Sequence, residues 1–379
     1  MTSKNPVLGT RGDFVTSPEI SQVFGEIVGV WLVSQWMNSA RAPIRLLELG
    51  PGRGTLMQDV LRVLCQFRVV KSAVKEIHLV ESSSAMKLAQ EKTLQPFAQE
   101  NNWKLHWHNS VDDIPRCTET YTMILAHEFF DALPFHLLEK THHGWQEVLI
   151  TSSDVPLSTL KISKSESLSG SVINVDSPRF KHVLSPSPTA ASTLLGLSSN
   201  RFQKLAVGSR IEISPAAFKI AYRLGQLVES NSDKSTGCGL VVDYGGEKAY
   251  GSSFRAFKNH KIVDVFHRPG ECDLTVNVDF AYLKEALSAH ATTLGPLSQA
   301  SFLTRMGIQM RVEALKRGAQ SEDRKHEIER GVLRLINLTG MGTQYQVMGF
   351  TSSKVGELKP EERWPFVDLE NLNTPESPQ

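Results

Sequence analysis

Residues 48–54 read ELGPGRG, and this short stretch decides the fold that we expect for the chain. The residues at 45–49 are mostly apolar and suit a buried strand, whereas 55–67 carry apolar residues at helical spacing on one face. A strand that ends in a glycine-rich turn and then opens a helix is the general ligand cradle of open α/β sheets. Glycine suits such a turn because the backbone bends sharply and approaches the ligand, where a Cβ atom would collide. The stretch therefore predicts an α/β fold with a binding site at the turn.

Strands and helices alternate on both sides of this turn, which is the pattern of a parallel sheet. We expect an α/β, Rossmann-like fold with an inserted substrate subdomain. One helix is expected to begin at a cap formed by Ser17 and to run to Met37, and another at the cap Ser214 with Pro215 at its first position. The expected strands are 45–49, 77–81, 104–107, 121–126, 239–244 and 344–351, and the other expected helices are 55–67 and 312–338.

A change of composition marks the predicted insertion. From 151 to 208 Ser, Thr and Pro are frequent and no long period emerges, and just before it 135–140 and 145–151 suit a hairpin. The chain after Lys359 is rich in Pro, Glu and Asn, which predicts disorder. The expected parts are an N-terminal helical segment (1–43), the first part of the sheet domain (44–150), the insertion (151–208), the second part of the sheet domain (209–352) and a disordered tail (353–379).

The charge balance excludes one class of partner. Lys and Arg number 41 against 40 Asp and Glu, so no global field attracts a polyanion and nucleic acid is not expected as the main partner. The four cysteines form no C-x-x-C pair, so we expect neither a metal site nor a disulfide framework, and a reducing compartment fits. The apolar stretch 27–36 is too short to span a bilayer. Residues 1–6 match neither a signal peptide nor an Arg-rich presequence, so they predict no localisation.

The spacing of the glycines indicates which cofactor the turn holds. Gly50, Gly52 and Gly54 give G-x-G-x-G, whereas dinucleotide sites use G-x-G-x-x-G and a helix N-terminus that cradles a pyrophosphate. Glu48 precedes the first of these glycines by two residues. S-adenosylmethionine has no pyrophosphate but carries a cationic sulfonium and an α-amino group, for which a carboxylate is a suitable neighbour. These residues therefore favour S-adenosylmethionine as the cofactor.

Acids after the next two strands complete the predicted cofactor site. Glu81 ends the second strand, where a carboxylate can accept hydrogen bonds from both ribose hydroxyls of a bound nucleoside. Asp112 and Asp113 follow the third strand, and they either reach the adenine amino group or belong to an ordinary loop. A glycine-rich turn in a protein without a ligand would need none of these acids. Their combination with the turn favours a cofactor site.

Several longer motifs resemble the MidA-like methyltransferase family and together cover most of residues 11–350. They are 12–26 (GDFVTSPEISQVFGE), 47–56 (LELGPGRGTL), 126–134 (AHEFFDALP), 242–245 (VDYG), 273–275 (DLT), 278–280 (VDF), 302–303 (FL) and 306–308 (MGI). The resemblance implies a seven-stranded sheet, a mitochondrial matrix location and methylation of an arginine on a subunit of respiratory complex I, whose assembly the mitochondrial members assist. It also implies that Asp13 lies over the cofactor. Family members carry a further segment before the first motif, and Asn277 stands where they usually have His or Asp.

Residues after the fourth strand are the candidates for chemistry. A guanidinium is a poor nucleophile because its lone pairs are delocalised and it stays protonated near neutral pH. Carboxylates that bind it bidentately orient one nitrogen and localise positive charge on the others. Glu128 and Asp131, three residues apart, follow the strand at which substrate meets cofactor in this topology. His127 is either a proton acceptor or a structural histidine beside a buried strand.

The residues themselves predict methyl transfer, whereas the arginine substrate rests on the resemblance. The familiar arginine methyltransferases carry a two-glutamate loop and a Thr-His-Trp motif, and 141–145 (THHGW) only mimics the latter. Two other interpretations stay open: a cofactor-binding assembly scaffold without turnover, and a small-molecule methyltransferase. A deep, closed pocket would favour the small-molecule enzyme, whereas an open groove beside the insertion would favour a protein substrate.

Overall fold

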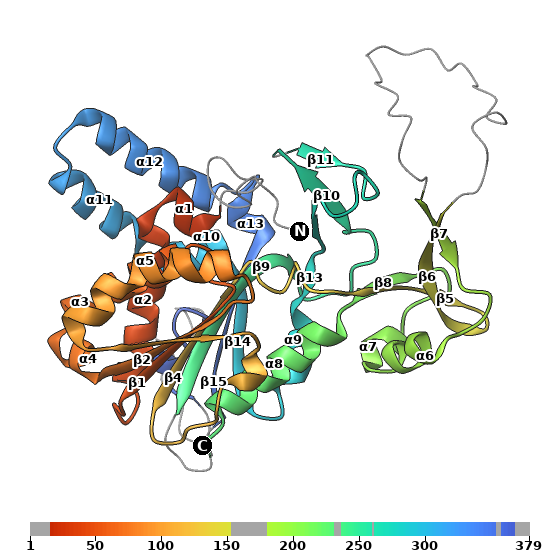
Figure 1. Cartoon of the computed structure of the whole chain (residues 1–379), viewed down its shortest axis with the longest axis horizontal. Helices are drawn as coiled ribbons and strands as arrows, with labels where there is room; N and C mark the ends of the chain where they lie inside the picture. Colours follow the sequence, from red (N-terminus) through yellow and green to blue (C-terminus); the bar gives the residue numbers. More distant parts are fainter. Residues whose placement is uncertain (1–15, 153–179, 231–235, 260, 354–357, 368–379) are drawn as a thin grey trace, which may run out of the picture. The chain divides into compact units, whose positions relative to one another are not determined.

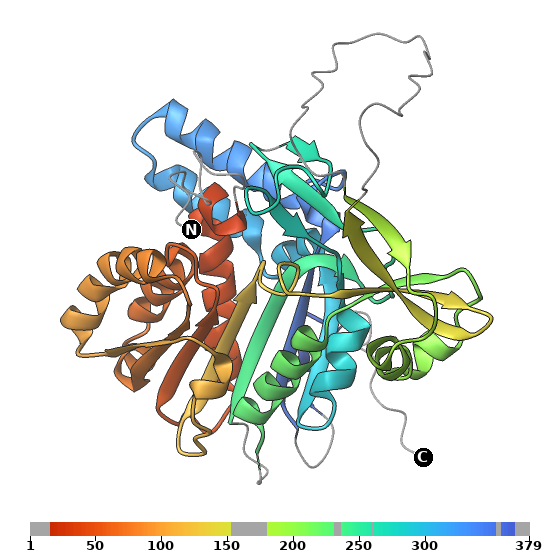
Figure 2. The ribbon, with the colours of Figure 1, turned by 45° about the vertical axis from the view of Figure 1, so that its right-hand side comes forward.

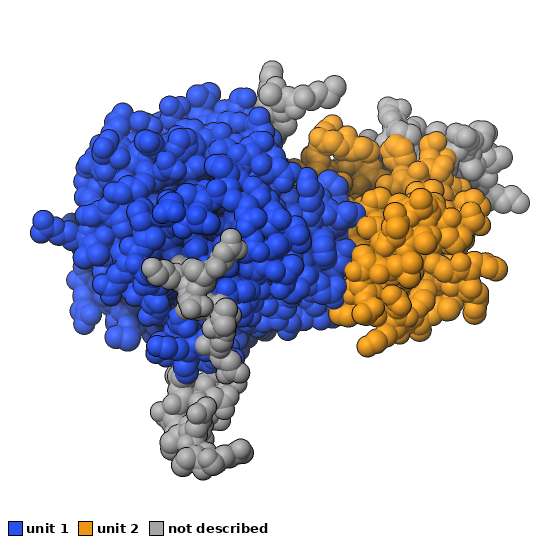
Figure 3. Space-filling model, turned by 90° about the horizontal axis from the view of Figure 1, so that it is seen from below, with its two compact units in different colours: residues 1–134, 214–248, 276–379 blue, residues 135–213, 249–275 orange. Residues whose placement is uncertain are grey.

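The computed structural model describes residues 16–152, 180–230, 236–259, 261–353 and 358–367. Asp13 lies outside the described residues, as does part of the predicted insertion. The chain divides into two compact units (Figure 3), the first comprising 1–134, 214–248 and 276–379 and the second 135–213 and 249–275. The described part of the insertion belongs to the second unit, together with the predicted hairpin that precedes it.

A sheet with the order β14-β15-β9-β4-β1-β2-β3 forms the centre of the first unit, and β13 pairs with β9 (Figure 1). The strands from β3 to β9 in this order are parallel, whereas β15 runs antiparallel to both β9 and β14. Parallel strands end at one edge, so the residues that follow them meet there. This is the predicted Rossmann-like fold. Its strands are β1 Ile44–Leu49, β2 Val74–Val80, β3 Lys104–His108, β4 Tyr121–His127, β9 Gly237–Gly246, β13 Val278–Asp279, β14 Ala291–Ser298 and β15 Tyr345–Ser352.

Helices cover both faces of this sheet because its strands are apolar on both sides. Leu46 belongs to the core cluster shared with α2, α3 and α10–α12, whereas its neighbour Leu47 belongs to the cluster shared with α8 and α9. Figure 2 shows α8 and α9 against one face. No helix among the described residues is both long and apolar enough to cross a membrane. The helices of this unit are α1 Ser17–Ile20, α2 Gln22–Met37, α3 Thr55–Gln66, α4 Arg68–Ala73, α5 Ser84–Asn101, η1 Val111–Asp113, α8 Pro215–Val228, α9 Phe280–Leu287, α10 Gln299–Arg305, α11 Ile308–Gly318, α12 Glu322–Ile336, α13 Met341–Gln344 and α14 Pro360–Arg363.

Two helices that the sequence predicts as continuous are broken. The helix expected from Ser17 to Met37 is interrupted at Ser21, which has extended backbone angles and accepts a hydrogen bond from the N–H of Val23. Ser17 is therefore not a cap: it is the first residue of the short α1, and its hydroxyl donates to Gln299. The predicted helix 312–338 likewise consists of α11 and α12. The cap at Ser214 is confirmed, since its hydroxyl accepts from Ala217 N.

The second unit contains a sheet with the order β7-β6-β5-β8 and a smaller one with the order β11-β10-β12. The predicted hairpin is confirmed, because β5 and β6 pair antiparallel with Thr141 opposite Gly144. Glu212, at the end of β8, accepts hydrogen bonds from the backbone N–H groups of Ser253 and Phe254, which ties 249–275 to the first of these sheets. The elements are β5 His136–Thr141, β6 Gly144–Ser152, β7 Phe180–Leu184, α6 Ala190–Gly196, α7 Asn200–Gln203, β8 Arg210–Ile213, β10 Arg255–Lys258, β11 Lys261–Val263 and β12 Asp273–Thr275.

The predicted disorder after Lys359 is wrong for the residues that are described there. Residues 360–363 form α14, and the ring of Phe366 packs against Trp31 and Phe302, with ring centroids 6.3 and 5.9 Å away. Arg305 donates hydrogen bonds to the carbonyls of Pro365 and Val367. Despite the polar composition of this stretch, the two aromatic contacts of the partly buried Phe366 fix it to the core.

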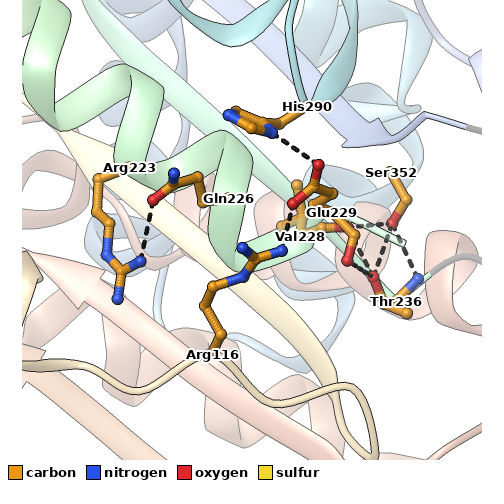
Figure 4. A network of polar contacts seen from close by, with 8 residues as sticks. All are labelled: Arg116, Arg223, Gln226, Val228, Glu229, Thr236, His290 and Ser352. Atoms are coloured by element: carbon orange, nitrogen blue, oxygen red, sulfur yellow. Dashed lines mark hydrogen bonds and ion pairs between the residues drawn. The ribbon is translucent and has the colours of Figure 1, made fainter. Parts of the chain in front are cut away.

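A network of hydrogen bonds and ion pairs lies at the edge of the sheet where the parallel strands begin (Figure 4). Glu229, just after α8, pairs with Arg116, which precedes β4, and accepts a hydrogen bond from Nδ1 of His290 at 2.8 Å. Ser352, at the end of the antiparallel β15, donates to the carbonyl of Val228 at 2.6 Å. Glu229 is thus paired with two basic side chains at this edge, those of Arg116 and His290.

We predict that Phe366→Ala lowers the free energy of unfolding by roughly 1–3 kcal/mol, because it removes a half-buried ring from a packed aromatic cluster. Urea denaturation followed by circular dichroism measures this change. Phe67→Ala, at a ring that is 45% exposed, is the control and should change stability by less than about 0.5 kcal/mol. Equal stability of Phe366→Ala and the parent would contradict the contribution of the terminal segment to the core.

Candidate cofactor and substrate site

The turn after β1 has the left-handed backbone that only glycine adopts without strain. Gly50, Gly52 and Gly54 have φ values of +60°, +53° and +82°. Gly50 donates a hydrogen bond to the carbonyl of Val80, so the turn is fixed to the end of β2. A Cβ atom on Gly50 would lie 3.0 Å from Cδ2 of Phe129, which shows that the turns after β1 and β4 are in close contact.

Gln90, on α5, links the glycine turn to Glu81. Its Nε2 donates to the carbonyl oxygen of Gly52 at 2.8 Å and to Oε2 of Glu81 at 3.2 Å, while its Oε1 accepts from Nε1 of Trp107 at 2.9 Å. The Gln90 side chain is fully buried. No sequence motif indicates Gln90, because an amide inside a helix is not distinctive and only the fold brings it to the turn.

The carboxyl group of Glu48 is buried and has few hydrogen-bond partners among the described residues. The residue is 2% exposed, and its Oε2 is buried without a hydrogen-bond partner among the described residues. Burial raises the pKa of Glu48 to about 8, although the backbone N–H of Met57 donates to the carboxylate and opposes that change. A buried acid in this state is stabilised by a cation that comes from outside the chain.

Asp112 lies on η1, on the loop that follows β3, and it has a partner already. Its Oδ2 is 2.5 Å from Nζ of Lys219, and its side chain is 45% exposed. The hydroxyl of Ser110 accepts from the backbone N–H of Asp112, which fixes the turn. A contact between Asp112 and an adenine amino group stays a prediction, as does the expected position of Asp13, which is not among the described residues.

Glu128 lies at the carboxyl end of β4 in a conformation that non-glycine residues rarely adopt, with φ of +49°. The hydroxyl of Tyr345 donates to its Oε1 at 2.8 Å, and the N–H of Ser17 also donates to the carboxylate. Burial, followed by the negative charge of Asp131, raises the pKa of Glu128 to about 8. The side chain keeps 13% exposure, so it is shielded from bulk water yet reachable.

Asp243, at the end of β9, holds the turn that contains these acids. It is fully buried, its Oδ2 accepts from the N–H groups of Phe130 and Asp131 at 2.9 and 3.3 Å, and its Oδ1 accepts from its neighbour Tyr244 at 2.9 Å. Burial and the charges of Asp131 and Glu128 raise the pKa of Asp243. The structure thus brings the predicted Glu128 and Asp131 together with Asp243, for which the sequence left substrate contact and loop capping both open.

His127 has a different environment from its neighbour. Its ring is 8% exposed and packs edge-on against Phe24, with ring centroids 5.2 Å apart. Nε2 lies 3.8 Å from Oε1 of Glu128 and has no hydrogen-bond partner among the described residues. Burial lowers the pKa of His127 to about 3, so the imidazole is neutral at pH 7. It does not neutralise Glu128, and it is a weak base for proton acceptance.

These residues fit S-adenosylmethionine. A glycine turn without Cβ atoms, a buried carboxylate with an unpaired oxygen, and an acid fixed at the end of β2 are what a cationic nucleoside cofactor needs. The fold and the site thus define the class of S-adenosylmethionine-dependent methyltransferases.

Comparison with known proteins agrees with this class. Residues 27–297 match the family model described as "Putative S-adenosyl-L-methionine-dependent methyltransferase". The chain belongs to this family. It is 36% identical to the zebrafish (Danio rerio) mitochondrial protein arginine methyltransferase NDUFAF7, over 90% of this chain and 77% of that one, and 34% identical to the human protein, over 89% and 73%. A crystal structure from Burkholderia thailandensis with bound S-adenosyl-homocysteine shares the fold, with a TM-score of 0.70 and 22% identity over 97% of this chain and 86% of that one.

Cofactor binding should depend on Gly52. We predict that Gly52→Val abolishes binding of S-adenosylmethionine in calorimetry, because a β-branched side chain enters the cradle and strains a backbone at φ +53°. Gly208→Val is the control: its φ is +88°, its Cβ would meet nothing within 4 Å, and it lies in the second unit. Undiminished affinity in Gly52→Val, with both variants folded, would remove the turn from the cofactor site.

The buried carboxyl group of Glu48 should lower the free energy of unfolding of the cofactor-free protein. Since the folded pKa is about 8, above the unfolded value near 4.5, Glu48 destabilises the fold increasingly as pH rises between these two values. We expect Glu48→Gln to raise the free energy of unfolding, least at pH 5 and by roughly 1–3 kcal/mol at pH 8.5. Urea denaturation across pH measures this difference. A variant that is destabilised at pH 8.5 would mean that the Glu48 carboxylate is satisfied within the protein.

Proposed function

We propose that this chain is a protein arginine N-methyltransferase of the mitochondrial matrix that modifies a subunit of respiratory complex I and supports assembly of that complex. The observation that carries the proposal is the group of buried acids Glu128, Asp131 and Asp243 beside the glycine turn. The names of the relatives, which are mitochondrial protein arginine methyltransferases, support the substrate class and the compartment. The complex I subunit rests on the family resemblance.

A guanidinium is the cation that best fits these acids. Glu128 and Asp131 each raise the other's cost of ionisation, and a planar cation with five N–H donors relieves that repulsion. Tyr345 keeps Glu128 in one orientation, and Asp243 keeps the backbone of the turn fixed. The site is therefore organised before the substrate arrives, which is the arrangement that electrostatic catalysis requires.

The chain's own residues orient the nucleophile and accept the proton that it loses. The bound cofactor supplies an electrophilic methyl group on a positively charged sulfur. Carboxylates on one side of a guanidinium localise its positive charge on the nitrogens they bind and leave the remaining nitrogen more nucleophilic. The transfer makes an N–C bond, breaks the bond between the methyl group and the cofactor's sulfur, which keeps the electron pair, and releases one N–H proton. Binding of the guanidinium displaces the proton that Glu128 holds in the free protein, and the resulting carboxylate can accept the released proton. His127 is less suited to this role, because burial lowers its pKa to about 3.

A substitution at Glu128 distinguishes an enzyme from a scaffold without turnover. We predict that Glu128→Gln leaves S-adenosylmethionine affinity nearly intact while turnover falls by about 10²-fold, because the negative charge that binds the guanidinium is lost. Turnover is measured as transfer of labelled methyl groups to protein in a mitochondrial extract. Glu229→Gln removes a carboxylate charge at the opposite edge of the sheet and should retain turnover.

The alternatives give different results in the same assays. If the protein is a scaffold, the Glu128→Gln variant would fully restore complex I assembly in cells that lack the native protein. No protein would then carry a methyl mark. A small-molecule methyltransferase would label no protein band but would label a low-mass fraction of the extract. Either result would overturn the proposed function.

A further inference from the structure

One glutamate and three histidines lie on one face of the sheet. Glu76 and His78 are alternate residues of β2, and His106 and His108 are alternate residues of β3. Since alternate strand residues point to the same face and His78 is directly opposite His106, all four share that face. The rings of His78 and His106 are stacked with centroids 4.7 Å apart.

The separations within this group are those of metal ligands. Oε2 of Glu76 and Nε2 of His78 are 3.3 Å apart, which is about the distance between two ligand atoms around a tetrahedral ion with bonds of about 2.0–2.1 Å. One ligand atom each from Glu76, His78 and His106 lie within 4.8 Å of one another. Nε2 of His106 is buried and has no hydrogen-bond partner among the described residues.

We propose that Glu76, His78 and His106 bind a divalent transition-metal ion of the zinc class. Two imidazoles and one carboxylate leave one position of a tetrahedral site for water. The donor set excludes magnesium and calcium, because these ions require six or more oxygen ligands.

His108 is not a ligand in this proposal, but it forms a hydrogen bond with the ligand His78. Its Nε2 lies 2.9 Å from Nδ1 of His78, and the planes of the two rings are nearly parallel, at an angle of 9°. When Nε2 of His78 binds the ion, its Nδ1 carries the proton and donates to His108. A histidine ligand characteristically donates its second N–H in this way, and the hydrogen bond fixes its orientation.

Arg45 is a neighbouring cation that opposes a bound ion. It lies opposite Glu76 on β1, but its Nη atoms donate to the carbonyl of Pro115 and to Oγ1 of Thr122. Its charge lowers the affinity of the site for any divalent ion, most strongly for hard ions that bind through charge alone. Imidazole-preferring metals, whose bonds to nitrogen do not depend on net charge, remain favoured.

The test is zinc binding to the untagged full chain after removal of metals with a chelator. Calorimetric titration with Zn²⁺ should show one site, and Co²⁺ should give the intense visible absorption of tetrahedral coordination. His106→Ala should weaken Zn²⁺ binding by at least about 100-fold and remove the Co²⁺ spectrum. Cys117→Ser and His182→Ala, each at a metal-binding side chain outside the group, should bind as the parent does.

Glu76→Gln gives a second, independent variant, because Glu76 is 35% exposed and its replacement does not disturb the core. It should also weaken Zn²⁺ binding at least tenfold while circular dichroism stays unchanged. Parent-like Zn²⁺ affinity in folded His106→Ala or Glu76→Gln would overturn the proposal, as would an octahedral Co²⁺ spectrum in the parent or loss of binding in Cys117→Ser. None of these outcomes depends on methyl transfer.

Discussion

The carboxylate of Asp243 is the interaction on which the site depends. Three backbone N–H groups donate to it, two from the turn after β4 and one from its own strand end. A buried carboxylate with several such donors is a strong constraint on the backbone, because any other path of the chain would leave it unsatisfied. The turn is thereby held with Glu128 in its left-handed conformation, next to the hydroxyl of Tyr345.

Buried carboxyl groups without a counter-charge among the described residues distinguish this edge of the sheet from the opposite one. At the opposite edge Glu229 is paired with Arg116 and His290. At the carboxyl edge Glu48 and Glu128 both have a pKa of about 8, so each holds a proton in the free protein at pH 7. Such groups are costly to the fold, and they are of use only when a cation arrives from outside. A sulfonium cofactor and a guanidinium substrate are two such cations.

The sequence predicted those features that depend on neighbours along the chain. The glycine turn, the strand before it and Glu81 after the next strand are all local signals, and the sheet followed from the alternation of strands and helices. The motif around Glu128 placed the candidate acids in one turn. Gln90, Tyr345 and Asp243 could not be assigned, because each acts on a residue distant in sequence. The break at Ser21 and the packing of Phe366 escaped prediction for the same reason: tertiary contacts decide them.

We infer that the buried, protonated carboxyl groups at this edge receive cationic ligands. The number of protons exchanged when S-adenosylmethionine binds tests it most directly, and calorimetry in buffers of different ionisation enthalpy measures that number. At pH 7 the parent should release close to one more proton (~1) than Glu48→Gln does, because the cation lowers the pKa of Glu48 from about 8. Equal proton exchange in the parent and in a Glu48→Gln variant that still binds would contradict the account.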